Sequence, residues 1–295
     1  MSSTVKAFLQ LHTAVFLAGF TGILGRLIVI NEGWLVWYRM LIAFLLLLLF
    51  AFIGKQSLRI ERKHLFQCLL IGLLIGFHWL LFYGSVKYGN VSVAVVCFAA
   101  TGSFTALLEP VLFKRRFNWA ELLLGLLVLL GIYLIFQLDQ QYQTAVILGV
   151  ASAFFSALFP IFNKRMIEKV KAPVLTFYEL AGGWVLLSFV LPFYFRISPA
   201  SYHFPTGSDW FWLLILAFFC TVVAFQLSVN ALKVISPFTA NLSYNLEPLY
   251  GMALAFFLFH EQKELNTGFF AGVALILLSV IIQTFIVYRK HKKRR

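Results

Sequence analysis

Residues 34–53 read WLVWYRMLIAFLLLLLFAFI, and this stretch decides the fold class. A helix needs about 20 mostly apolar residues to cross a membrane, and this stretch has that length. Leu45 to Leu49 are apolar on every side, whereas a strand of an outer-membrane barrel would alternate apolar and polar residues. We therefore predict an all-α integral membrane protein.

Ten stretches of this kind run along the chain, separated by short segments rich in Gly, Pro or charged residues. Of the 295 residues, 61% are hydrophobic and only 12% are charged, whereas a soluble domain has about 25% charged residues. This composition excludes a soluble globular enzyme and a disordered chain. We expect ten transmembrane helices, at residues 8–30, 34–53, 65–86, 91–113, 119–136, 145–163, 173–195, 210–232, 238–259 and 267–287.

Basic residues indicate how the chain is oriented. The formal net charge is +13, and with a cytoplasmic N-terminus 19 of the 24 Lys and Arg residues lie in cytoplasmic segments. This asymmetry follows the positive-inside rule and argues against a nucleic-acid partner, which would need a basic face on a soluble fold. We expect a multi-pass protein of the plasma membrane with both termini in the cytoplasm. The basic tail, residues 289–295, is expected to contact anionic lipids, and no obligate protein partner is indicated.

Short motifs recur along the chain at a nearly constant offset. Residues 36–39 match 176–179 at an offset of 140, and residues 91–94 match 237–240 at an offset of 146. We interpret the two halves as five-helix repeats. An odd number of helices per repeat places the second half upside down in the membrane, as in many secondary transporters with a binding site between the halves. The predicted repeats are residues 1–143 and 144–295.

The second half carries motifs typical of one family. They are Leu246-Glu247-Pro248, Phe259-His260-Glu261 and a Gly-rich last helix that includes Gly268 to Gly272. With ten helices as five plus five and basic cytoplasmic ends, the chain resembles the EamA-like transporter family of the drug/metabolite transporter (DMT) superfamily. The first half departs from the family pattern, because Lys114-Arg115-Arg116 stands where a Glu would be expected. The resemblance implies the fold and the transport class, with export as the commoner role, and it implies no particular substrate.

Two ionisable residues occupy equivalent positions in the predicted repeats. Arg39 and Glu179 each lie about two turns into the second helix of their half. Charged groups at membrane depth are costly and normally face the bundle interior or a water-filled cavity. One interpretation is a cavity with opposite charges at its two ends, suited to a zwitterionic or charged metabolite. The alternative is that local partners neutralise both groups, or that Arg39 extends to the membrane surface.

The ninth stretch carries the deepest carboxylate, Glu247, and Pro248 after it removes one backbone hydrogen bond. Because both faces of this helix carry polar residues, we expect it to be central in the bundle. A kinked polar helix near the midplane indicates a binding site, and the alternative is a purely structural proline kink. The candidate binding residues on this helix are Asn241, Tyr244, Asn245 and Glu247.

Three further candidates lie on neighbouring helices. His78 lies in the middle of the third stretch beside Trp79, where it would relay protons or bind substrate, or would equally serve as a hydrogen-bonded packing residue. Gln226 on the eighth stretch is expected to join the central polar groups. We expect the third, fourth, eighth and ninth stretches to form most of the cavity, with contributions from the second and seventh.

The sequence contains no phosphate-binding loop, no zinc-protease motif and no serine-nucleophile motif. Its six histidines are scattered without metal-ligand spacing, so we predict no enzyme, no catalytic residue, no metal site and no cofactor. The predicted function is a secondary transporter that moves a small organic metabolite, such as an amino acid, by alternating access. Glu179 and Glu247 are the candidates for proton coupling, which needs a carboxylate that changes partner between states. The alternatives are a passive channel or facilitator, and an intramembrane enzyme that uses His78 and Glu247 as an acid–base pair.

Overall fold

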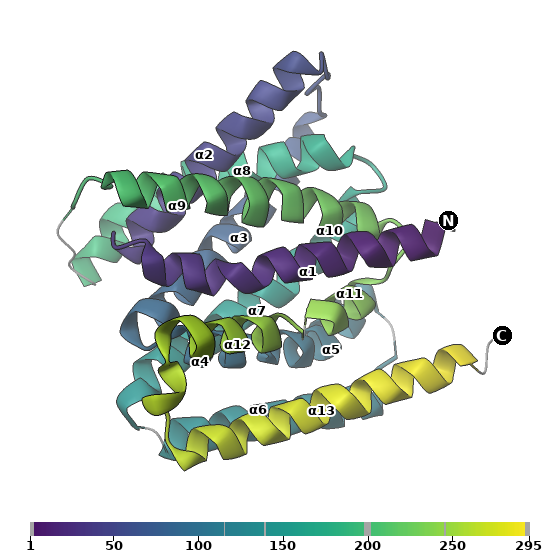
Figure 1. Ribbon diagram of the computed structural model, residues 1–295. Coiled ribbons are helices and arrows are strands. Elements are labelled where there is room, and N and C mark those ends of the chain that lie inside the picture. The colour runs from purple at the N-terminus through teal and green to yellow at the C-terminus, as the bar shows by residue number, and fades with distance from the viewer. Residues whose placement is uncertain (1–2, 115, 139, 198–201, 245, 293–295) are drawn as a thin grey trace.

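The computed structural model describes residues 3–114, 116–138, 140–197, 202–244 and 246–292, and within these ranges the chain forms helices and no strand (Figure 1). The first half contains α1 (Ser3–Leu27), α2 (Glu32–Ile53), α3 (Arg62–Tyr88), α4 (Val91–Phe98), α5 (Ala100–Phe113) and α6 (Trp119–Leu138). The second half contains α7 (Gln143–Met166), α8 (Ala172–Ile197), α9 (Gly207–Ala217), α10 (Ala224–Leu232), α11 (Pro237–Tyr244), α12 (Glu247–Phe259) and α13 (Thr267–Lys292). Two 3₁₀ turns, η1 (Gln140–Tyr142) and η3 (Glu261–Lys263), and a π-helix, η2 (Phe218–Val223), complete the chain.

The predicted all-α membrane fold is confirmed. Eight segments of the described chain are long and apolar enough to cross a membrane, among them Val91–Phe113, which joins α4 and α5, and Gly207–Leu232, which joins α9, η2 and α10. The last two predicted stretches contain the shorter apolar segments Glu247–Phe259 and Thr267–Ile282. The chain is therefore a multi-pass membrane protein, and the count of ten crossings stays a prediction.

Side chains that accept backbone N–H groups mark where several helices begin. Asn31 caps α2 by accepting the N–H two residues later at 2.8 Å, and Asn90 caps α4 by accepting the N–H three residues later at 2.9 Å. At the start of α9, Thr206 accepts the N–H of Asp209 at 3.2 Å while the Asp209 carboxylate accepts the N–H of Thr206 at 2.9 Å. These caps satisfy donors that have no partner in a first helical turn, and so they define where the chain re-enters the bundle.

In each half the equivalent helix is interrupted at the equivalent position. α4 ends at Phe98 and α11 ends at Tyr244, an offset of 146 residues, and a new helix starts within the next three residues in each case. In the second half Pro248 lies in the first turn of α12. Its missing N–H costs nothing there, because the N–H groups of a first turn have no partner within the helix, and the proline disfavours helical structure in the residues before it. The sequence predicted a kink in one helix, and the structure has two separate helices.

The packing of the helices repeats the same duplication. α3 packs against α7 and α8, and correspondingly α10 packs against α1 while α9 packs against α2. α5 packs against α7, and α12 packs against α1. α6 and α13 lie side by side along one side of the bundle (Figure 1). Exchanging the two halves retains these pairs of neighbouring helices. The bundle therefore consists of two similar units, and helices of each unit pack against helices of the other.

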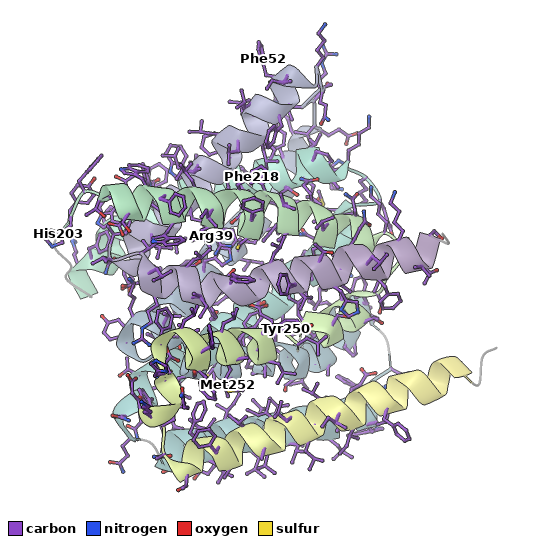
Figure 2. The ribbon with its side chains drawn as sticks, in the orientation of Figure 1. Arg39, Phe52, His203, Phe218, Tyr250 and Met252 are labelled. Carbon is purple, nitrogen blue, oxygen red and sulfur yellow. The ribbon has the colours of Figure 1, made fainter. Side chains whose placement is uncertain are left out.

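The bundle has two ends. α1 starts and α13 finishes at one end (Figure 1), where α5 also ends; we call it the Lys114 end, after the residue that follows α5. α1 and α12 finish at the opposite end, which we call the Glu261 end. Large apolar side chains such as Phe52, which is 82% exposed, project from the outside of the bundle (Figure 2), as expected of a surface that faces lipid.

Candidate functional site

A cavity lies inside the bundle where helices of both halves meet. Its volume is about 80 Å³, counted as the space open to the centre of a water molecule, and one water needs about 10–15 Å³ on this measure. Residues of α1 to α5, α7, η2 and α10 to α12 line it. The cavity therefore has room for several waters or a small organic molecule, and it is the candidate functional site.

The cavity wall itself is duplicated. Five pairs of residues that lie 146 positions apart line it together, namely His78 and Ala224, Trp79 and Phe225, Phe82 and Ser228, Phe98 and Tyr244, and Thr101 and Glu247. The last two pairs lie at the helix interruptions. The interruptions of both halves thus face one space, and this space lies on the boundary between the halves, as the predicted repeat requires.

Arg39 is a buried cation in this wall, only 1% exposed, and it lies inside the bundle (Figure 2). Its guanidinium donates to Thr221 Oγ1 at 2.8 Å, to the Tyr83 hydroxyl at 2.7 Å and to the Cys220 carbonyl at 3.2 Å. It also lies 3.7 Å from the centre of the Trp79 ring, a cation–π contact. Every one of these partners is neutral, and in the described part of the chain Arg39 has no carboxylate at ion-pair distance.

The π-helix η2 explains why a backbone carbonyl is available to Arg39. At its end the N–H of Ala224 donates to the carbonyl of Phe219, five residues back, instead of to Cys220. The Cys220 carbonyl, which would accept the Ala224 N–H in an α-helix, accepts from Arg39. Single turns of π-helix occur frequently at functional sites, and this one holds the cation at the cavity.

Glu247 is the carboxylate of the cavity and is 5% exposed. It lies at the first position of α12, at the interruption of the ninth predicted stretch. No residue of the described chain forms a hydrogen bond or an ion pair with its side chain, although Arg39 attracts it electrostatically from elsewhere in the cavity wall. Among the described residues, the cavity therefore presents one cation and one carboxylate, and neither has a close partner of opposite charge.

His78 is held by α7 at the edge of the cavity. Its Nδ1 lies 2.8 Å from the Ser152 hydroxyl oxygen and 3.2 Å from the Ser152 carbonyl, and the Ser152 hydroxyl donates to the His78 carbonyl at 2.9 Å. Because the hydroxyl hydrogen is used in that last bond, both oxygens act as acceptors and place the imidazole hydrogen on Nδ1. Nε2 is then the acceptor atom of a ring that lines the cavity.

Of the other predicted site residues, the structure places some in the cavity wall and others outside it. Trp79 and Tyr244 line the cavity, whereas Glu179 and Gln226 are not part of its wall. Asn245 lies outside the described residues, and Asn241 belongs to α11 but its side chain lies outside the described part. Whether these residues bind substrate stays a prediction.

The expected set of cavity helices needs one correction. The third, fourth, eighth and ninth predicted stretches line the cavity, as does the second through Arg39, but the seventh, which is α8, contributes no lining residue. α8 instead crosses α3 so closely that a Cβ atom on Gly72 would lie 1.9 Å from the Glu179 carbonyl oxygen. This crossing directs α8 towards α3 and away from the cavity, and α1 and α7 line the wall instead.

Sequence reasoning missed the polar residues that α7 contributes. Ser156 and Asn163 line the cavity, and Ser152 holds His78. With Pro160 these residues recur every three or four positions, which places them on one face of a helix. That periodicity was available in the sequence and would have indicated the polar face. Within the described residues no group of three His, Cys, Asp or Glu side chains is placed to hold a metal ion.

Comparisons with known proteins agree with the duplicated architecture. The family model described as the EamA-like transporter family matches the chain twice, over residues 5–137 and 143–285. The chain is similar to "Uncharacterized transporter YetK" of Bacillus subtilis, with 25% identity over 94% of this chain and 86% of the relative. It is also similar to an "Uncharacterized transporter" of Haemophilus influenzae, with 32% identity over 48% of this chain and 49% of the relative.

A solved structure shares the fold. A crystal structure, described only as that of a protein, superposes with a TM-score of 0.68 over 95% of this chain and 97% of the other, at 17% sequence identity. At that identity the likeness concerns the arrangement of the helices alone.

Proposed function

Because the chain belongs to the EamA-like transporter family, we propose that it is a secondary transporter that carries a small zwitterionic metabolite, such as an amino acid or a related solute, by alternating access. One observation carries this proposal. The central cavity presents a guanidinium and a carboxyl group, Arg39 and Glu247, and neither has an ion-pair partner among the described residues. Intramembrane charges of this kind are functional residues by default.

The two charged groups would bind opposite ends of the substrate. The three hydrogen bonds of Arg39 use three of the five N–H groups of a guanidinium, and the remaining two suit the paired oxygens of a carboxylate. Glu247 would receive an ammonium group. A ligand with both charges neutralises both buried groups at once, whereas a ligand with one charge leaves the other group buried and unpaired, which is strongly unfavourable.

The rest of the wall suits an apolar substrate body. Phe82, Phe98, Phe159 and Phe225 line the cavity together with Trp79. Small-molecule sites are commonly apolar with a few polar groups that orient the ligand. The aromatic wall would therefore contribute contact area, and the two charges would set the orientation.

The duplicated helices support alternating access. We propose ten membrane crossings in two inverted five-helix repeats, because the cavity lies between the halves and the helix interruptions of both face it. With the Lys114 end in the cytoplasm, 19 of the 24 Lys and Arg residues lie on that side. Both termini would then be cytoplasmic and the membrane the plasma membrane, with export as the direction and anionic lipids at the basic face.

Ligand binding is the first test. Purified protein is screened by thermal shift against amino acids, amines and carboxylic acids of matched size. A ligand at 100 times its Kd stabilises the folded protein by about 2.7 kcal/mol, so zwitterions are expected to raise the melting temperature more than the amine or the acid alone. A stronger shift with singly charged ligands would contradict the zwitterion assignment.

Transport by variants is the second test. Counterflow of the radiolabelled zwitterion in proteoliposomes is expected to fall to background in Arg39→Gln and in Glu247→Gln. Arg59→Gln and Glu168→Gln change the same residue types at exposed positions and are expected to transport normally. Because Glu247 forms no hydrogen bond in the described chain, Glu247→Gln should also fold normally. Normal counterflow in both cavity variants would contradict the site. Ion conductance without counterflow would favour a channel, and net flux without counterflow would contradict alternating access.

A further inference from the structure

A second buried carboxyl group lies outside the cavity wall. Glu179 is 0% exposed, and neither of its oxygens has a hydrogen-bond partner in the described chain. No Lys, Arg or His of the described residues lies at ion-pair distance from it. A carboxylate left in this position would carry a large desolvation cost with nothing to offset it.

The surroundings of Glu179 exclude water and lipid. α8 and α3 cross at Gly72 and Gly183, where a Cβ atom on Gly183 would lie 2.5 Å from the Gly72 carbonyl oxygen. From α3, Cys68 is the titratable group that faces the Glu179 carboxyl, and from α7 the neutral side chain of Asn163 faces it. Among the described residues, no charged group on α2, α3 or α10, the helices packed against α8, interacts with it.

Asn163 also carries an unsatisfied polar atom, and it links Glu179 to the cavity. Its side-chain oxygen Oδ1 is buried and also lacks a hydrogen-bond partner in the described chain. Glu179 Oε1, Glu179 Oε2 and Asn163 Oδ1 are therefore three buried acceptor oxygens without a hydrogen-bond partner in the described chain, and the Asn163 side chain faces the Glu179 carboxyl. Buried acceptors are nearly always satisfied, and Asn163 at the same time lines the cavity beside the proposed substrate site.

We propose that Glu179 and Asn163 form a proton-binding site that couples proton movement to transport; this rests on the proposed function. One proton on Glu179 makes an O–H that donates to Asn163 Oδ1, which satisfies an oxygen on each residue. A hard metal cation would need about six oxygen ligands, and these two side chains offer three. A proton is the cation that the site accommodates.

The amide of Asn163 provides the link to the substrate. With Glu179 protonated, Asn163 Oδ1 accepts from it and the NH₂ group is turned to the cavity. When a change of conformation lets a cavity water reach Glu179, the proton passes to that water, giving a carboxylate and a hydronium ion, and the amide turns over so that its NH₂ donates to the carboxylate. The oxygen then faces the cavity, so the substrate meets an acceptor in place of a donor and the two occupancies are coupled.

Infrared spectroscopy tests the proton directly and without substrate. Protonated carboxylic acids have a C=O stretching band that carboxylates lack, and the difference spectrum between wild type and Glu179→Gln at neutral pH is expected to contain one such band. The matched control, Glu168→Gln, removes an exposed carboxylate and is expected to leave the acid band unchanged. Absence of an acid band in the Glu179 difference spectrum would overturn the proton site, whatever the protein transports.

Transport under an imposed pH gradient tests the coupling. Proteoliposomes receive a mixture of common radiolabelled amino acids, and one proton coupled per substrate would turn a gradient of one pH unit into about a tenfold substrate gradient. Glu179→Gln and Asn163→Leu are both expected to lose this pH-driven accumulation. Because Gln is an uncharged mimic of the protonated carboxyl group, Glu179→Gln is expected to retain substrate exchange in the absence of a gradient. A wild type that exchanges substrate but ignores the gradient would overturn the coupling and leave the transporter standing. A wild type without any exchange would instead overturn the proposed function.

Discussion

The two ends of the bundle share one arrangement, an arginine over a phenylalanine ring, but differ in the charged groups around it. At the Glu261 end, Arg26 from the end of α1 lies over the ring of Phe259, 4.5 Å from its centre. At the Lys114 end, Arg165 from the end of α7 lies over the ring of Phe113 at 4.4 Å. The two phenylalanines are 146 residues apart, so each half supplies an arginine to the other half's aromatic ring.

The residues that follow the two rings differ in charge. At the Glu261 end the fully buried carboxylate of Glu261 binds Arg26 and accepts from Ser92 Oγ at 2.5 Å, the Ser92 N–H at 2.8 Å and the Val91 N–H at 3.1 Å. These N–H groups form the start of α4, where a helix favours an anion. At the Lys114 end, Arg165 is exposed and donates to the Leu112 carbonyl at 2.5 Å.

This difference suggests that the two ends do not open equally easily. An ion pair with a buried member and several hydrogen bonds holds the Glu261 end together, whereas the contacts of Arg165 at the Lys114 end are an exposed hydrogen bond and a ring contact, with a hydrogen bond from Lys164 to the Leu232 carbonyl beside them. Alternating access requires each end to open in turn, and a population shifts by the difference in stabilisation between the two states. We therefore expect the Glu261 end to be the more strongly closed one in the described conformation.

Neutralising Glu261 is expected to have the largest effect. Glu261→Gln removes the charge that satisfies Arg26 and the first turn of α4, and breaking a buried ion pair costs about 3–5 kcal/mol. Because the Arg26 side chain is 35% exposed and regains water, we expect the lower end of that range. The melting temperature in detergent is the measurement, and Glu264→Gln, at an exposed position of the same loop, is the control. Equal melting temperatures of the two variants would contradict the proposed closure.

Removing Arg26 is expected to cost less. Arg26→Gln leaves Glu261 with its three donors from α4, so the loss is about 1–2 kcal/mol, in the range of hydrogen bonds to charged groups. The double variant Arg26→Gln/Glu261→Gln completes a cycle that isolates the pair. If the two single losses simply add, Glu261 acts on α4 alone and the ion pair contributes nothing to closing this end.

The pair at the Glu261 end illustrates what the sequence could and could not predict. The helices, a kink near Pro248 and the presence of a charged cavity follow from local composition and spacing, although the structure has two separate helices at the kink. Arg26 and Glu261 lie 235 positions apart, and no local pattern indicates that two such residues meet. In the structure Arg26 lies in the last turn of α1, and its side chain, which is 35% exposed, pairs with the buried carboxylate of Glu261.

Glu179 illustrates a second limit. Its position two turns into its helix predicts membrane depth, but a helix that is apolar on all sides carries no signal for which face meets which neighbour. The close crossing at Gly72 turns Glu179 towards α3, whereas the equivalent Arg39 faces the cavity. The π-helix that supplies the Cys220 carbonyl is likewise invisible in a sequence whose residues suit an α-helix equally well.

Removing Arg165 probes the other end and is expected to have a smaller effect than removing Arg26. Arg165→Gln loses one exposed hydrogen bond and a ring contact, and an exposed cation–π contact is worth about 0.5–1 kcal/mol. The same thermal measurement compares the two variants directly, since both replace an arginine that lies over a phenylalanine. A loss at Arg165 that equals or exceeds the loss at Arg26 would show that the Lys114 end is not the weaker one.

The smallest effect concerns a feature that both ends share. Lys114 and His260, 146 residues apart, each follow a helix with positive φ, at 52° and 57°. Non-glycine residues are strained in this left-handed region, by about 1–2 kcal/mol, while glycine adopts it freely but gains disorder in the unfolded chain. Lys114→Gly and His260→Gly are therefore each expected to stabilise the protein by at most about 1 kcal/mol, and by equal amounts. Equal shifts in melting temperature would show that the backbone does not contribute to the asymmetry, whereas stabilisation at one end alone would show that it does.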